Sequence, residues 1–176
     1  HLPRYGLGNY VSPKPHNPPT QKEAKQLDDL SRAGKRLMGF CRTNLFKRLE
    51  SSGEAFQQSL ERHVLRNYIF LHAIENDLPL PLGTQDAGLL DTANYDEDID
   101  DQSADAELFA EGEDERTQDT VPLNLRDVAA FRARAAETYL LYAGKFKKRF
   151  KWLRQDLFVV ELKEDLISTT NKSCRS

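Results

Sequence analysis

The sequence predicts an all-α protein: an irregular helical bundle around a long central helix, with a Pro-rich extended N-terminal arm and a long acidic loop. Apolar residues recur at helical spacing on both sides of a stretch dense in Asp and Glu. Four prolines between residues 13 and 19 precede the first helical segment and favour extended chain. We therefore divide the chain into an extended connector (1–19), a helical region (20–84), an acidic mobile loop (85–121) and a second helical region (122–176).

Composition favours a protein that is only partly packed. Charged residues make up 30% of the 176 residues and apolar residues 39%, and the mean hydropathy is −0.67. Cys41 and Cys174 have no closely spaced partner, so we expect neither a disulfide framework nor a Cys-rich metal site. The chain has no apolar run of about 18 residues, as a membrane span requires. We expect a cytoplasmic protein with no membrane partner.

The N-terminal arm mixes two kinds of segment. Residues 1–11 contain Tyr, Leu and Gly and are compatible with a short strand. The prolines that follow remove backbone donors and favour an extended link. They are Pro13, Pro15, Pro18 and Pro19.

The first helix is predicted from its start signal. Thr20 and Glu23 have the spacing of a capping box, in which each side chain accepts a backbone N–H of the other residue. A helix should therefore begin near Gln21, with weak points at Gly34 and Gly39.

Two further helical patterns follow. Apolar residues form a stripe over 37–50, after which Ser51 and Glu54 resemble a second capping box. The strongest helical pattern runs over 55–75 and is apolar on more than one side, which is typical of a central helix. The prolines of NDLPLPLG should end it.

The segment 86–120 is rich in Asp and Glu, with Arg116 as its only base. Like charges at this density repel one another and bury little, which predicts a mobile loop. Two interpretations remain open: a solvated spacer, or a mimic of nucleic-acid charge that shields a basic surface.

The second helical region is predicted to begin with a helix capped by Asn124 and interrupted near Gly144. The next stretch, KFKKRFKWLRQDLF, has an apolar stripe spaced by four, three and four residues, which predicts a basic amphipathic helix. A last helix is expected over 159–169.

We find no catalytic, cofactor-binding or metal-binding motif in the sequence. There is no phosphate-binding Gly-rich loop, nucleophile elbow or pair of histidines at metal spacing. His63 and His72 are nine residues apart, which places them on opposite faces of one helix. We expect each to be a packed or half-exposed histidine.

A basic segment is the main candidate for function. Six of the ten residues from Lys145 to Arg154 are Lys or Arg, and three are aromatic. Clustered cations bind a phosphate backbone by releasing its counterions, and an adjacent aromatic ring can lie against sugar or base. The alternative is a solvated helix face. The candidate residues are Lys145, Lys147, Lys148, Arg149, Lys151, Trp152 and Arg154.

A second basic group precedes the Ser-Ser-Gly sequence. On a helix over 37–50, Arg42 projects into the apolar arc, where an unpaired guanidinium would be costly. Its anion is either a nearby Glu or an external phosphate. Together with Lys47 and Arg48, it is a candidate for nucleic-acid contact or for docking of another domain.

The stretch TNLFKRLESSGEAF carries a family resemblance. Leu45–Ser52, followed by Ala55 and Phe56, is similar to a run found between the two RecA-like lobes of Swi/Snf-type (superfamily two) helicases, particularly bacterial helicase-like proteins of defence and restriction systems. WLRQDLFVVELKEDL resembles the stretch before the second lobe, and HLPRY resembles the exit from the first. The resemblance spans most of the chain and is weakest in the acidic loop.

The resemblance implies the helical insert of a DNA-dependent ATPase that moves on duplex DNA. The expected partners are the flanking RecA-like lobes and the DNA backbone, bound without sequence preference. The resemblance implies ATP and Mg for the whole protein, but the motifs that bind them belong to lobes outside these residues. Lys47–Ser52 would lie at the lobe junction.

A second hypothesis is a protein-interaction bundle without nucleic-acid binding. In that case, exposed Tyr142 and Trp152 would dock a partner subunit and the acidic loop would tune specificity. Salt distinguishes the two hypotheses, because it weakens phosphate binding far more than an apolar contact.

Overall fold

The computed structural model describes residues 3–82 and 127–175, except for the side chains of 33–38, 40–42 and 172–175. The described chain is mostly helical with one small sheet, which confirms the all-α class. The long helices are α1 (Gln21–Ser51), α2 (Gly53–Glu75), α3 (Val128–Ala143) and α4 (Glu161–Arg175). The short elements are the 3-10 helices η1 (Pro3–Tyr10), η4 (Lys147–Arg149) and η5 (Gln155–Leu157) and the strands β1 (Leu80–Leu82) and β2 (Lys151–Leu153). The predicted acidic loop lies outside the described residues.

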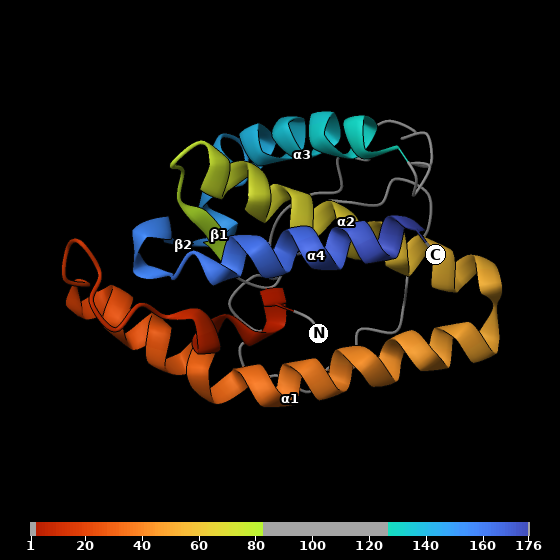
Figure 1. Ribbon diagram of the computed structural model, residues 1–176, viewed down its shortest axis with the longest axis horizontal. Coiled ribbons are helices and arrows are strands. Elements are labelled where there is room, and N and C mark those ends of the chain that lie inside the picture. The colour runs from red at the N-terminus through yellow and green to blue at the C-terminus, as the bar shows by residue number, and fades with distance from the viewer. Residues whose placement is uncertain (1–2, 83–126, 176) are drawn as a thin grey trace.

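Helix α2 is the predicted central helix. It packs against α1, α3 and α4, and Figure 1 shows α3 and α1 on opposite sides of it. The 3-10 helix η1 packs against both α1 and α4. The second half of α2 therefore touches neighbours on several sides, as its broad apolar pattern predicts.

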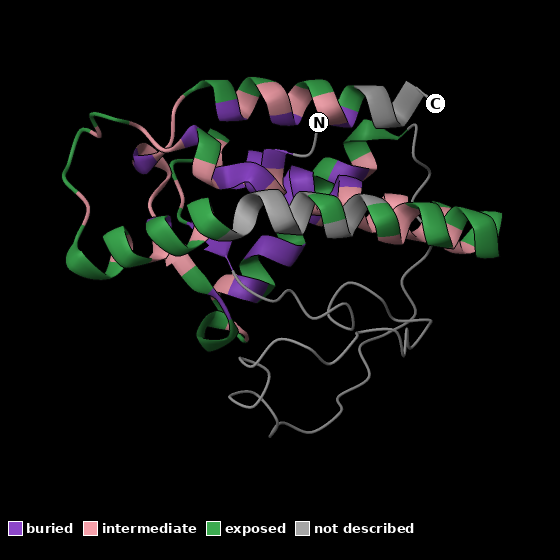
Figure 2. Ribbon diagram, turned by 90° about the horizontal axis from the view of Figure 1, so that it is seen from below, coloured by how far each residue is buried: buried purple, intermediate pink, exposed green. Residues whose placement is uncertain are grey.

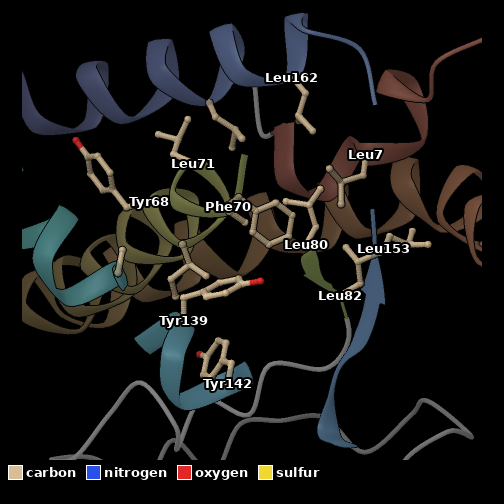
Figure 3. Packing of buried hydrophobic residues seen from close by; sticks show 14 of the residues in the cluster. Leu7, Tyr68, Phe70, Leu71, Leu80, Leu82, Tyr139, Tyr142, Leu153 and Leu162 are labelled. Atoms are coloured by element: carbon tan, nitrogen blue, oxygen red, sulfur yellow. The ribbon is translucent and has the colours of Figure 1, made fainter. Parts of the chain in front are cut away.

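The hydrophobic core is built around α2 (Figure 3). Phe70 is 1% exposed, and leucines from η1, α4 and both strands surround it. Aromatic contacts extend the core toward α3: the ring centroids of Tyr68 and Phe131 are 5.7 Å apart, and those of Tyr142 and Phe150 are 4.3 Å apart. Buried aromatic rings at these separations contribute both area and favourable ring geometry.

Helix α1 begins as its capping box predicts. The backbone N–H of Thr20 donates to Glu23 Oε2 at 2.8 Å, and the N–H of Glu23 donates to Thr20 Oγ1 at 3.3 Å. The helix continues through Gly34 and Gly39, the two expected weak points, to Ser51. A single glycine costs a helix only about 1 kcal/mol.

Two of the predicted helix caps are shifted. The cap of α2 is Ser52 rather than Ser51: its Oγ accepts from the N–H of Ala55 at 3.4 Å. Asp127 caps α3, accepting from the N–H of Ala130 at 2.9 Å. Asn124, the predicted cap, lies outside the described residues.

The expected strand over residues 1–11 was wrong. Pro3–Tyr10 forms η1, and only Val11 makes a bridge, to Phe158. A Cβ on Gly8 would collide with the backbone of Ser31, so the glycine permits the close approach of η1 to α1. Tyr10 fixes the other side by donating to Asp165 Oδ2 at 2.6 Å.

The predicted basic amphipathic helix was also wrong. After α3 ends at Gly144, as expected, the chain forms η4, β2 and η5. Strand β2 pairs with β1 in antiparallel register, with Leu80 opposite Leu153 and Leu82 opposite Lys151. This pairing with a distant segment competes with local helix formation, and helical periodicity alone does not reveal it. Helix α4 follows, as predicted.

Candidate nucleic-acid interface

The segment Lys145–Lys151, here called the basic turn, presents its cations outward. Its apolar side chains point the other way: Phe150 is 6% exposed and stacks on Tyr142, and the following Leu153 is fully buried. Burial of these rings fixes the backbone of a segment that has little regular structure. The exposed cations are Lys145, Lys147, Lys148, Arg149 and Lys151.

Trp152 supports the basic turn from within. Its indole Nε1–H donates to the carbonyl oxygen of Lys147 at 2.9 Å. Its ring makes edge contacts with Tyr139 and Phe150, with centroids 5.9 and 6.0 Å apart. Trp152 is therefore half-buried, and Tyr142 is fully buried, so the expectation of two exposed docking aromatics was wrong.

The ring of Phe146 makes cation–π contacts with two of the cations. The Nζ of Lys145 lies 5.7 Å and the Cζ of Arg149 lies 5.1 Å from the centre of its ring. Cations at such distances are attracted to the negative face of the ring. Phe146 is half-buried against the core, so it holds both cations at the edge of the molecule.

Arg154 belongs to a different site. Its Nε donates to Glu23 Oε1 at 3.0 Å, and its Nη1 donates to Asp156 Oδ2 at 3.3 Å. The hydrogen bond from Arg154 is the main reason that the pKa of Glu23 is lowered, with a further contribution from the N–H of Thr20. Arg154 thus ties the end of β2 to the start of α1.

The KRLESS motif lies at the corner between α1 and α2. Lys47 is exposed and Arg48 is half-buried, and Figure 2 shows the mostly exposed surface at this end of α1. Two apolar neighbours are also exposed, Phe46 at 66% and Leu49 at 50%. The backbone at Arg42 lies within α1, but its side chain is outside those described.

The structure separates the two basic groups that the sequence suggested. Arg154 contacts Glu23 near the start of α1, whereas Lys47 lies 24 residues further along the same helix. At a rise of 1.5 Å per residue, the two points are about 36 Å apart. Figure 1 shows the basic turn region and the α1–α2 corner at opposite ends of the molecule. The basic turn and the α1–α2 corner are therefore two separate surfaces.

Two further arginines, Arg4 and Arg66, lie close to His63 where η1 meets α2. Tyr5 of η1 meets His63 of α2, with ring centroids 5.2 Å apart at an interplanar angle of 81°. Burial, followed by the charges of Arg4 and Arg66, lowers the pKa of His63 to about 3. Contacts between residues 58 positions apart leave no local signal in the sequence.

The residues that the structure describes contain no group of three or more His, Cys, Asp or Glu able to hold a metal ion. None of the described helices is both long and apolar enough to cross a membrane.

Comparison of the chain with protein-family models, curated proteins and solved structures finds no match.

Proposed function

We propose that this chain is the helical region between the two RecA-like lobes of a Swi/Snf-type ATPase, where it positions the lobes and contacts the DNA backbone without reading sequence. The observation that carries the DNA contact is the basic turn, whose five exposed cations fall within seven residues. In the whole protein, ATP and Mg would be held by the lobes, and no residue of this chain is assigned to them.

The basic turn suits a phosphate backbone because its cations are dense and its main chain is held in place. Each Lys or Arg that neutralises a phosphate releases a condensed counterion, which favours binding. The hydrogen bond from Trp152 to the Lys147 carbonyl keeps the cations from dispersing on a loose loop. Trp152 would support the turn from behind instead of stacking on a base.

The α1–α2 corner suits docking of a lobe. Phe46 and Leu49 expose apolar surface beside Lys47, and interfaces combine apolar and charged groups in this way. The first and last described elements, η1 and α4, pack on each other, an arrangement compatible with insertion into a larger protein.

Duplex binding at a series of salt concentrations tests the DNA contact. Fluorescence anisotropy with a labelled duplex should give a log–log salt slope of about −4, because each neutralised phosphate contributes about 0.9. Replacing Lys147 and Lys148 with Gln should reduce that slope by about 2 and weaken binding of unrelated sequences equally.

A matched control removes two positive charges elsewhere. Arg32→Gln with Arg132→Gln changes net charge equally but removes cations that are paired with Asp28 and Glu75. The proposal expects this control to keep the salt slope of the unmodified chain. Absence of duplex binding at low salt, or equal losses in both double variants, would refute the DNA contact.

The corner is tested in the complete ATPase. Lys47→Ala with Arg48→Ala should lower DNA-stimulated ATP hydrolysis while leaving the thermal unfolding of this region nearly unchanged, since neither side chain is buried. ATP turnover equal to that of the unmodified protein would contradict a role in lobe docking.

A further inference from the structure

The acidic loop and the rest of the chain carry opposite net charges. Residues 85–121 hold 14 of the chain's 28 Asp and Glu residues but only one of its 25 Lys and Arg residues. The loop therefore has a net charge of −13, and the rest of the chain, with 14 acids and 24 bases, has a net charge of +10. Most of the negative charge lies in Asp96–Glu115, here called the acidic run, where 11 of 20 residues are Asp or Glu and none is Lys or Arg.

The chain enters the acidic loop beside the basic turn. Strand β1 ends at Leu82, which lies directly opposite Lys151 of the basic turn in the antiparallel pair (Figure 1). Residues opposite each other in such a pair have Cα atoms about 5 Å apart. Only 13 residues separate Leu82 from the acidic run. The run is therefore attached to the sheet within one strand spacing of the cations.

The other end of the loop does not keep the acidic run away from the basic turn. The described chain resumes at Asp127, the cap of α3, and α3 ends just before the basic turn. The 16 residues of α3 span about 24 Å at a rise of 1.5 Å per residue. The 44 residues between Leu82 and Asp127 can span up to about 145 Å when fully extended. The linker is thus long enough for the acidic run to meet the basic turn.

The acidic run and DNA offer the same kind of charge to the basic turn. The turn has five exposed cations, and the run has 11 carboxylates to face them. Both polyanions are attracted by these cations, and the attraction grows with the number of opposite charges. Attachment through a short linker gives the run a local concentration of about 1 mM, whatever the concentration of the protein. The run therefore competes with any free polyanion for the turn.

We propose that the acidic run is an internal competitor, which binds the basic turn and lowers the affinity of this chain for nucleic acid. The effect on DNA rests on the proposed function, whereas the internal contact does not. A local concentration of about 1 mM, set against a dissociation constant of about 0.1 mM, lowers DNA affinity about tenfold. Salt screens the contact, so the effect fades as ionic strength rises. A solvated spacer would have no such effect.

The only tryptophan of the chain provides the test of the internal contact. The indole N–H of Trp152 donates to the Lys147 carbonyl, so its NMR signal reports on the basic turn without being one of the cations. The test compares the unmodified chain with an amide variant of equal length, in which Asn and Gln replace the 11 acids of the acidic run. The two indole signals should differ at about 50 mM salt and converge at about 1 M, where charges are screened beyond about 3 Å.

A peptide supplied separately makes the test specific. A synthetic peptide of residues 96–115 should move the indole signal of the amide variant toward that of the unmodified chain, and an uncharged amide version of the peptide should not. Lys147→Gln with Lys148→Gln should weaken this response. Arg32→Gln with Arg132→Gln is the control, because these arginines already form ion pairs elsewhere. Equal weakening by both double variants, or identical indole signals at low salt with no response to the peptide, would overturn the proposal.

Duplex binding measures the competition itself. At low salt the amide variant should bind a labelled duplex about tenfold more tightly than the unmodified chain, and the difference should shrink as salt rises. Equal duplex affinities of the two chains at low salt would overturn the competition. If neither chain binds a duplex, the proposed DNA contact fails, and the indole signals still decide whether the acidic run binds the basic turn.

Discussion

The two halves of α2 meet very different surroundings. From Val64 to Ala73, nearly every residue is buried, and Ile69 is fully so. From Thr43 through the α1–α2 corner to Leu60, no residue is buried (Figure 2). One continuous helix therefore belongs partly to a packed body and partly to a projecting corner. Packing therefore stabilises the fold at one end of α2, and the other end presents a surface.

The largest expected difference comes from removing one phenylalanine in each region. Phe70→Ala should lower the free energy of unfolding by about 3–5 kcal/mol, because it empties part of the core. Phe46→Ala should change it by less than about 0.5 kcal/mol, because 66% of Phe46 is exposed. Urea unfolding of both variants measures the two values. Similar losses would show that the corner is packed as tightly as the body.

A pair of glycine substitutions tests the difference in packing between η1 and the middle of α1. Gly8→Ala should destabilise the chain by about 1–3 kcal/mol, because its Cβ would press against the Ser31 backbone where η1 meets α1. Gly39→Ala should stabilise α1 by about 0.5–1 kcal/mol, because a Cβ there meets no atom within 4 Å. Thermal unfolding measures both changes. Effects of the same sign would contradict the difference in packing.

Parts of the fold with strong local signals could be predicted from the sequence. The capping box of Thr20 and Glu23 located the start of α1, and the broad apolar pattern over 55–75 located the central helix. Lys145–Arg154 was mispredicted because apolar spacing of four, three and four also fits a turn and strand that bury the same residues. The segment forms a strand rather than a helix because Lys151–Leu153 pairs with Leu80–Leu82, some seventy residues earlier in the sequence.

The sequence could predict a candidate site only where its charged residues are neighbours in the chain. The cations of the basic turn are contiguous in sequence, so composition alone located them. Their geometry was not predictable, because it depends on Trp152 reaching back to the Lys147 carbonyl and on Phe150 stacking on Tyr142. Arg154 is not part of that surface because it donates a hydrogen bond to Glu23, which is 131 residues away in the sequence.

The smallest expected effect tests the corner itself. Ser52→Ala should lower local stability by about 0.5–1 kcal/mol, because the Oγ of Ser52 accepts the N–H of Ala55 at the start of α2. Ser51→Ala should have almost no effect, since Ser51 is the last residue of α1 and alanine favours helix. Amide hydrogen exchange at Ala55 and Phe56 reports this change even if global unfolding does not, because an exposed corner opens locally. Faster exchange in the Ser51 variant than in the Ser52 variant would place the cap one residue earlier. That shift would rotate the first turn of α2 and, with it, the surface formed by Phe46, Lys47 and Leu49.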